Sequence, residues 1–198
     1  KEELDILFNT SIRSISLLSA AICCGIAAIA KEFTPFFFGQ GYDSCVILII
    51  TLAPVLFIKG YSLISRNLYL IPNQMENQLT ASVIAGAVVN LIVNLLLIPR
   101  LGALGAVIGT LVAELIACLW QYKSLLGKVD CLKSVLAGLT YFAIGILMYC
   151  GVRLTARYLD TTLFLKVAIE IMVGVILYGV FCLVYWKISH NDAELKMI

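Results

Sequence analysis

Six long apolar runs constrain this chain more than any other feature of its sequence. Each run is about 20 residues long, the length that an α-helix needs to cross roughly 30 Å of hydrocarbon. The runs raise the hydrophobic share of the 198 residues to 62% and leave only 13% charged. They are continuous rather than alternating, which argues against the strands of an outer-membrane barrel. The sequence therefore predicts an all-α, polytopic bundle of six transmembrane helices.

The expected spans fall into two groups along the chain. Residues 1–125 hold four spans and residues 126–198 hold the last two, followed by a polar tail. The expected limits of the spans are about 12–30, 45–70, 79–98, 104–122, 132–152 and 163–186. Residue 1 is Lys rather than Met and no cleavable signal precedes the first span, so we expect that an N-terminal part of a longer chain is missing.

Prolines and polar residues suggest where these helices end or bend. Pro35 and the glycines that follow it are expected to end the first helix. The second span would be ~39 Å long as one straight helix, which exceeds the hydrocarbon thickness, so Pro54 predicts a kink within it. Asn73 and Glu76 have the spacing of a capping box that starts the third span. A polar loop is expected from Gln121 onward.

The third and fourth spans are predicted to form a tight hairpin. Gly86 lies in the first of these helices, and Pro99 is expected to end it. In the return helix small residues recur at every fourth position from Gly105 through Gly109 to Ala117. This pattern lets helix backbones approach closely in lipid, so we expect Gly86, Gly105 and Gly109 to lie at packed helix interfaces.

Four polar residues lie deepest in the predicted spans: Lys59, Asn90, Asn94 and Glu114. A charged side chain at the bilayer centre costs about 2.5 to 3.5 kcal/mol, so such residues need a partner or a function. Lys59 and Glu114 are offset by only ~7 Å along the membrane normal, which allows an ion pair. A cavity contact and a proton-linked role are the alternatives for this pair. The asparagines are expected to form interhelical hydrogen bonds.

The distribution of basic residues predicts the orientation in the membrane. The side of the N-terminus carries eight Lys and Arg residues and the opposite side five: Lys1, Arg13, Arg66, Lys123, Lys128, Lys133, Lys187 and Lys196 against Lys31, Arg100, Arg153, Arg157 and Lys166. The N-terminal side is therefore expected to face the cytoplasm. On the outer side, Arg153 and Arg157 are expected to anchor the interface, and Lys166 has the spacing to pair with Glu170.

Arg13 and Arg66 lie near the predicted cytoplasmic mouth of the bundle. A guanidinium group suits a pyrophosphate because it donates paired hydrogen bonds to the oxygens. Arginines at helix ends also snorkel to the interface, and this interpretation stays open. Together with Lys59, the two arginines are the candidate substrate-binding residues.

Other chemistry finds little support in the sequence. The seven cysteines lack the paired spacing of a metal site, and no motif suggests a cofactor or a nucleic-acid partner. The single histidine, His190, lies in the tail, and no loop holds paired carboxylates. A membrane-embedded glycosyl or acyl transferase is therefore not expected.

Three segments carry a resemblance to a known family. The runs PFFFGQGYDS, LYLIPNQMENQ and VVNLIVNLLLIPRLGALGAVIGTLVAEL resemble the polysaccharide flippases of the multidrug/oligosaccharidyl-lipid/polysaccharide exporter superfamily. The resemblance implies a MATE-like transporter with two lobes, of which this chain is similar to helices nine to fourteen. It implies that the complete protein flips undecaprenyl-pyrophosphate-linked oligosaccharides across the bacterial cytoplasmic membrane by alternating access.

The same resemblance implies the partners of the chain. These are the lipid-linked oligosaccharide, membrane lipids, the missing N-terminal lobe and the polysaccharide polymerase machinery. A cation-coupled multidrug antiporter of the same superfamily is the alternative, and Glu114 is the acidic residue that keeps it open.

Overall fold

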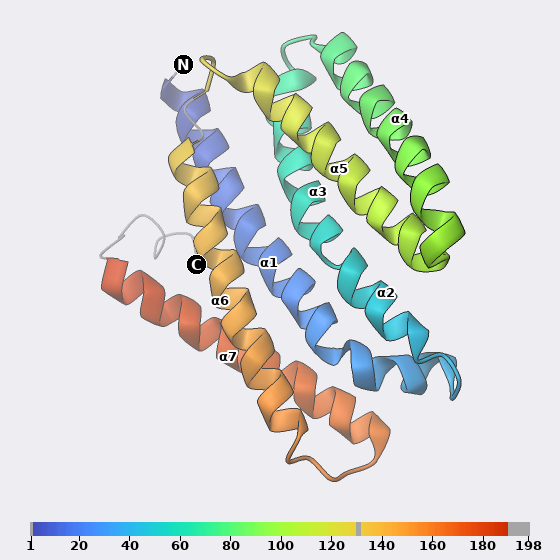
Figure 1. Cartoon of the computed structure of the whole chain (residues 1–198). Coiled ribbons are helices and arrows are strands. Elements are labelled where there is room, and N and C mark those ends of the chain that lie inside the picture. The colour runs from blue at the N-terminus through green and yellow to red at the C-terminus, as the bar shows by residue number, and fades with distance from the viewer. Residues whose placement is uncertain (1, 130–131, 190–198) are drawn as a thin grey trace.

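The chain folds into a bundle of long helices joined by short turns (Figure 1). The structure is a computed structural model and describes residues 2–129 and 132–189; the predicted polar tail, 190–198, lies outside them. The elements are α1 (Glu2–Phe38), α2 (Ser44–Leu52), α3 (Pro54–Ser65), η1 (Arg66–Leu70), α4 (Glu76–Leu101), α5 (Ala103–Leu125), α6 (Leu132–Ala156) and α7 (Leu163–Ser189). Within the described residues, six helical spans are long and apolar enough to cross a membrane. The predicted all-α, six-span class is therefore confirmed.

Helix α1 lies between two parts of the bundle. It packs against α6 and α7 on one side and against α3 on the other, and α5 joins the α4–α5 hairpin to α2 and α3. One apolar core is shared by α1, α6 and α7 and includes Tyr141, Met148 and Trp186. A second core, around Phe8 and Tyr61, joins the start of α1 to α3, η1 and α5. The second core therefore fixes α3 and α5 against the start of α1.

Two prolines lie inside helices that they were expected to end. Helix α1 continues through Pro35 to Phe38, and α4 continues through Pro99 to Leu101. Each proline lies in the last turn of its helix, where its fixed φ is compatible with the helix and little of the hydrogen-bond ladder follows. The hairpin turns at Gly102, whose φ of +57° favours glycine. Pro54 acts as predicted, because the span changes from α2 to α3 at that residue.

Two further predictions about helix ends were wrong. The N-cap of α4 is Met75 without a side-chain cap, and the amide of Asn73 donates to the carbonyl of Tyr69 instead of forming a capping box. Helix α5 continues to Leu125, so Gln121 is a buried helical residue rather than the start of a loop. The chain before the first predicted span is also helical, from Glu2 onward. Hydropathy alone underestimated how far these helices extend.

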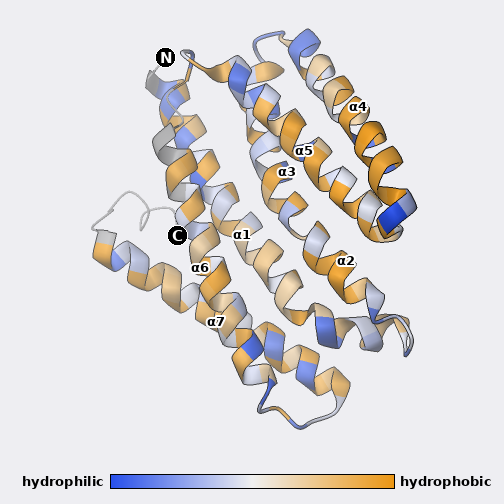
Figure 2. Ribbon diagram, viewed as in Figure 1, coloured by the Kyte–Doolittle hydropathy of each residue, from blue (hydrophilic) through white to orange (hydrophobic). Residues whose placement is uncertain are grey.

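Helix α4 presents a broad apolar face that the other described residues do not cover. The hydropathy colouring shows this face in the middle of the helix, with polar residues gathered at its ends (Figure 2). Its exposed apolar residues include Val83, Ile84, Val88, Leu91, Ile92, Leu95 and Leu96. Such a face is suited to lipid tails or to further transmembrane helices.

Candidate functional site

A groove of about 770 Å³ lies between α3, α4 and α5. Small residues of α4 and α5 leave the space open, and longer polar side chains project into it. Its lining residues are Lys59, Gly60, Ser62, Leu63, Arg66, Leu79, Val83, Gly86, Ala87, Asn90, Thr110, Ala113, Glu114, Ala117 and Gln121. The groove is mostly apolar but holds charged side chains, and it is a candidate substrate site because intramembrane charges are expensive unless they serve a purpose.

Lys59 and Glu114 form an ion pair across this groove. The Nζ of Lys59 lies 2.6 Å from Oε1 of Glu114, and the side chains are 58% and 27% exposed. The neighbouring Gly60 allows α3 to approach α1, since a Cβ there would lie 3.1 Å from the side chain of Ile15. Lys59 lies about 100° further round α3, where it reaches Glu114 of α5. An ion pair between these two residues is one of the three roles that the sequence allowed for them.

The two candidate arginines occupy different places. Arg66 lines the groove at the first residue of η1, a five-residue π-helical stretch, and its side chain is exposed. Its Nε donates to Oδ1 of Asn67 at 3.3 Å. Arg13 lies on α1, is half-buried, and is not among the lining residues. The groove therefore brings together Lys59 and Arg66 of the predicted trio, but not Arg13.

A hydrogen-bonded junction closes one end of the groove. Gln121 of α5 accepts a hydrogen bond from Ser65 of α3 at 2.7 Å and donates one to Ser82 of α4 at 3.2 Å. All three residues are buried. The junction fixes three helices relative to one another. Hydropathy does not predict this junction, because it places Gln121 at the start of a polar loop.

The predicted asparagines lie on the α4 face that meets α5. The amide of Asn94 donates to Oδ1 of Asn90 at 2.9 Å, within α4, so this bond is not the interhelical one that was expected. Both side chains lie against Gly109 of α5. Asn90 also lines the groove. Gly105 lies against the backbone of Leu97, and Gly86 lies against the backbone of Ala113. The structure thus places all three predicted packing glycines at the α4–α5 interface.

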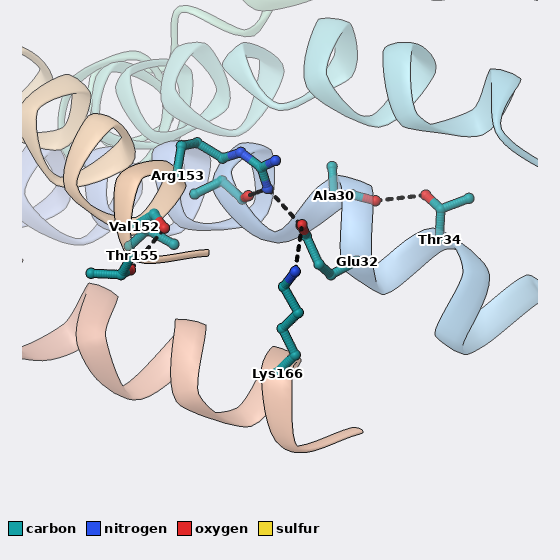
Figure 3. A network of polar contacts seen from close by, with 8 residues as sticks. Ala30, Glu32, Thr34, Val152, Arg153, Thr155 and Lys166 are labelled. Carbon is teal, nitrogen blue, oxygen red and sulfur yellow. Dashed lines mark hydrogen bonds and ion pairs between the residues drawn. The ribbon is translucent and has the colours of Figure 1, made fainter. Parts of the chain in front are cut away.

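A second charged cluster lies between α1, α6 and α7, away from the groove (Figure 3). Arg153 of α6 donates to Glu32 of α1 at 2.5 Å and to the carbonyl of Ala28 at 3.2 Å. The Nζ of Lys166, on α7, lies 3.9 Å from the other oxygen of Glu32. The expected pairing of Lys166 with Glu170 is therefore replaced by a contact with Glu32, which no sequence pattern singles out.

Comparison with known proteins identifies a solved structure with a similar fold. No protein-family model and no curated protein matches the sequence. The structure is similar to a solved structure of the lipid II flippase MurJ in an inward closed conformation, with a TM-score of 0.78 and 18% sequence identity. The match covers 96% of this chain but only 41% of that chain, so the present chain spans less than half the length of that flippase. At this identity the likeness shows the fold alone.

Proposed function

We propose that this chain is part of a flippase that moves undecaprenyl-pyrophosphate-linked oligosaccharide repeat units across the bacterial cytoplasmic membrane for surface polysaccharide synthesis. The observation that carries the proposal is the groove lined by Lys59 and Arg66, on a fold similar to that of a lipid II flippase. The substrate combines a long apolar lipid with an anionic head. A cation-lined groove between membrane-spanning helices fits that combination.

Lys59 and Arg66 differ in how readily each could contact a pyrophosphate within the proposed site. Arg66 is exposed and sits at one end of the groove, so its guanidinium is placed to meet a pyrophosphate first. Lys59 forms an ion pair with Glu114. An entering pyrophosphate competes with Glu114 for the ammonium group, and Glu114 recovers it when the substrate leaves. The exchange gives Lys59 an anionic partner in both states, as an intramembrane charge requires.

We propose that the opposite wall of the transport path comes from an N-terminal lobe of the same protein. Alternating access then consists of movement of the two lobes around the groove. The exposed apolar face of α4 is a surface against which that lobe or lipid tails could pack. The polysaccharide polymerase machinery is the proposed downstream partner, because a flipped repeat unit must then be polymerised.

A cation-coupled multidrug antiporter is the second candidate, and Glu114 is the observation that favours it. This carboxylate lines the groove and is 27% exposed, so it is accessible to a cation. An antiporter of this kind would export cationic dyes in a manner that depends on Glu114. A flippase would require the pyrophosphate of its lipid substrate instead.

Binding of undecaprenyl pyrophosphate to the complete protein, purified in detergent, tests the proposal. The expected affinity exceeds that for undecaprenol, and Arg66→Gln weakens binding roughly tenfold because it removes charge-assisted hydrogen bonds. Lys123→Gln is the matched control, since Lys123 is exposed on α5 and does not line the groove. Equal affinity for the two lipids, or equal effects of the two variants, would contradict the proposal.

A further inference from the structure

Glu170 is a buried acid that the proposed transport site does not use. It lies on α7 and is fully buried. Neither of its carboxylate oxygens has a hydrogen-bond partner among the described residues. Buried polar groups are normally satisfied, and an ionised carboxylate without a donor is the most costly exception. Its position therefore calls for a chemical explanation.

The surroundings of Glu170 are apolar on one side. It lines a groove of about 620 Å³ between α1, α6 and α7, together with residues such as Met148, Gly174 and Tyr178. Among the described residues that line this groove, Glu170 is the one charged side chain. Tyr178 is also titratable, but its hydroxyl donates to the carbonyl of Leu17 at 2.8 Å. The groove thus offers Glu170 no cation.

The charged groups near Glu170 are those of the second charged cluster. They are Glu32 of α1, Arg153 of α6 and Lys166 of its own helix. Both cations are directed to Glu32: Arg153 is hydrogen-bonded to it, and the Nζ of Lys166 lies 3.9 Å from its other oxygen. Glu32 is therefore paired with both cations, and Glu170 is paired with neither. Lys166 lies four residues before Glu170, one helical turn away, within reach of either acid.

We propose that Glu170 is a proton-binding site, and that Lys166 moves from Glu32 to Glu170 when the proton leaves. In the structure Glu32 holds both cations, which matches a protonated Glu170. On deprotonation the O–H bond breaks, the proton passes to water, and the carboxylate keeps the electron pair. The ammonium group of Lys166 then has a new partner one turn along α7, while Arg153 keeps its bond to Glu32. The contact of α7 with α1 changes with it.

Infrared difference spectroscopy of the complete protein in lipid vesicles tests the site directly. A protonated carboxylic acid gives a carbonyl stretching band that an ionised one lacks. We expect the wild type to show such a band near neutral pH and to lose it on alkaline titration, whereas Glu170→Gln lacks the band. Asp160→Asn is the control, because Asp160 is exposed in the α6–α7 turn, and it should leave the band unchanged. If the wild type shows no carbonyl band, or if Glu170→Gln leaves the band in place, the proposal is overturned.

A second variant keeps the test decisive if Glu170→Gln does not fold. Lys166→Met removes the cation that is proposed to stabilise the ionised Glu170, and it keeps a side chain of similar length. The carbonyl band should then persist to higher pH than in the wild type. An unchanged midpoint of the titration would reject the transfer of Lys166. Neither measurement depends on transport, so the outcome is distinct from that of the flippase proposal.

Discussion

At the scale of single residues, the groove shows how an intramembrane cation can be stabilised by an acid on a neighbouring helix. Lys59 is held by Glu114, whereas Arg66 at the end of the groove is exposed. Removing Lys59 alone takes the partner from an acid that lies within a membrane-spanning helix. For that reason a single substitution of Lys59 combines two effects, on the substrate and on the fold, and a second substitution is needed to separate them.

Gln121 gives a residue-scale prediction about stability. Gln121→Met removes both hydrogen bonds to Ser65 and Ser82 while keeping a side chain of similar length. We expect a loss of about 1 to 2 kcal/mol in the free energy of unfolding, because interhelical hydrogen bonds in membranes have that magnitude. Unfolding in mixed micelles by a denaturing detergent measures it. Ser124→Ala is the control, since the hydroxyl of Ser124 bonds only within its own helix, to Trp120; equal losses would remove the junction from the account.

The positions and partners of some polar residues could be predicted from the sequence better than those of others. Lys59 and Glu114 lie in the middle of apolar runs, so their depth and their possible pairing follow from helix geometry. Glu32 and Gln121 lie near the ends of predicted spans, where a polar residue is expected to meet the membrane surface. Their burial depends on which helices pack together. That information is absent from the hydropathy of a single segment.

At the scale of elements, the α4–α5 hairpin is held by backbone contact. A Cβ added at Gly109 would overlap the side chain of Asn94, and one at Gly105 would lie 2.6 Å from the carbonyl carbon of Leu97. Small residues therefore set the distance between the two helices. This seam was predictable because its four-residue period is visible in the sequence. The helix ends were less predictable, because a proline in a last turn need not end its helix.

Gly109→Leu tests this seam. We expect the substitution to reduce the free energy of unfolding by about 2 kcal/mol or more and to lower the folded yield in membranes, because the new side chain forces α4 and α5 apart. The matched control is Ala103→Leu, an equal type of enlargement at an exposed position of the same helix. Folded yield after detergent extraction compares them. If both variants are tolerated alike, close packing at Gly109 does not stabilise the hairpin.

At the scale of the whole molecule, six alternating spans place the N-terminus, the α3–α4 turn and the α5–α6 turn on one side of the bundle (Figure 1). The fold class and the number of spans were predictable because apolar length alone determines them. The packing of α1 between α3 and the α6–α7 pair was not, since many orders of six helices share one hydropathy pattern. The charge distribution predicts an orientation, with this side in the cytoplasm.

Cysteine labelling tests the orientation. In an otherwise cysteine-free protein, a membrane-impermeant reagent should reach a cysteine placed at Gln40 or at Thr161 from outside the cell. It should reach one at Gly127 only after the membrane is opened. All three positions are exposed in turns between spans. External labelling at Gly127 would reverse the orientation and with it the side from which the substrate enters.

The most direct test of the account is the transport of undecaprenyl-pyrophosphate-linked oligosaccharide by the complete protein in vesicles, measured for variants of the Lys59–Glu114 pair. If charge at Lys59 binds the pyrophosphate, Lys59→Arg should retain most transport and Lys59→Gln should lose it. Adding Glu114→Gln to Lys59→Gln relieves the unpaired acid, so the double variant should fold as well as the wild type but still fail to transport. Recovery of transport together with folding in the double variant would show that Lys59 only stabilises the helices, and would contradict the account.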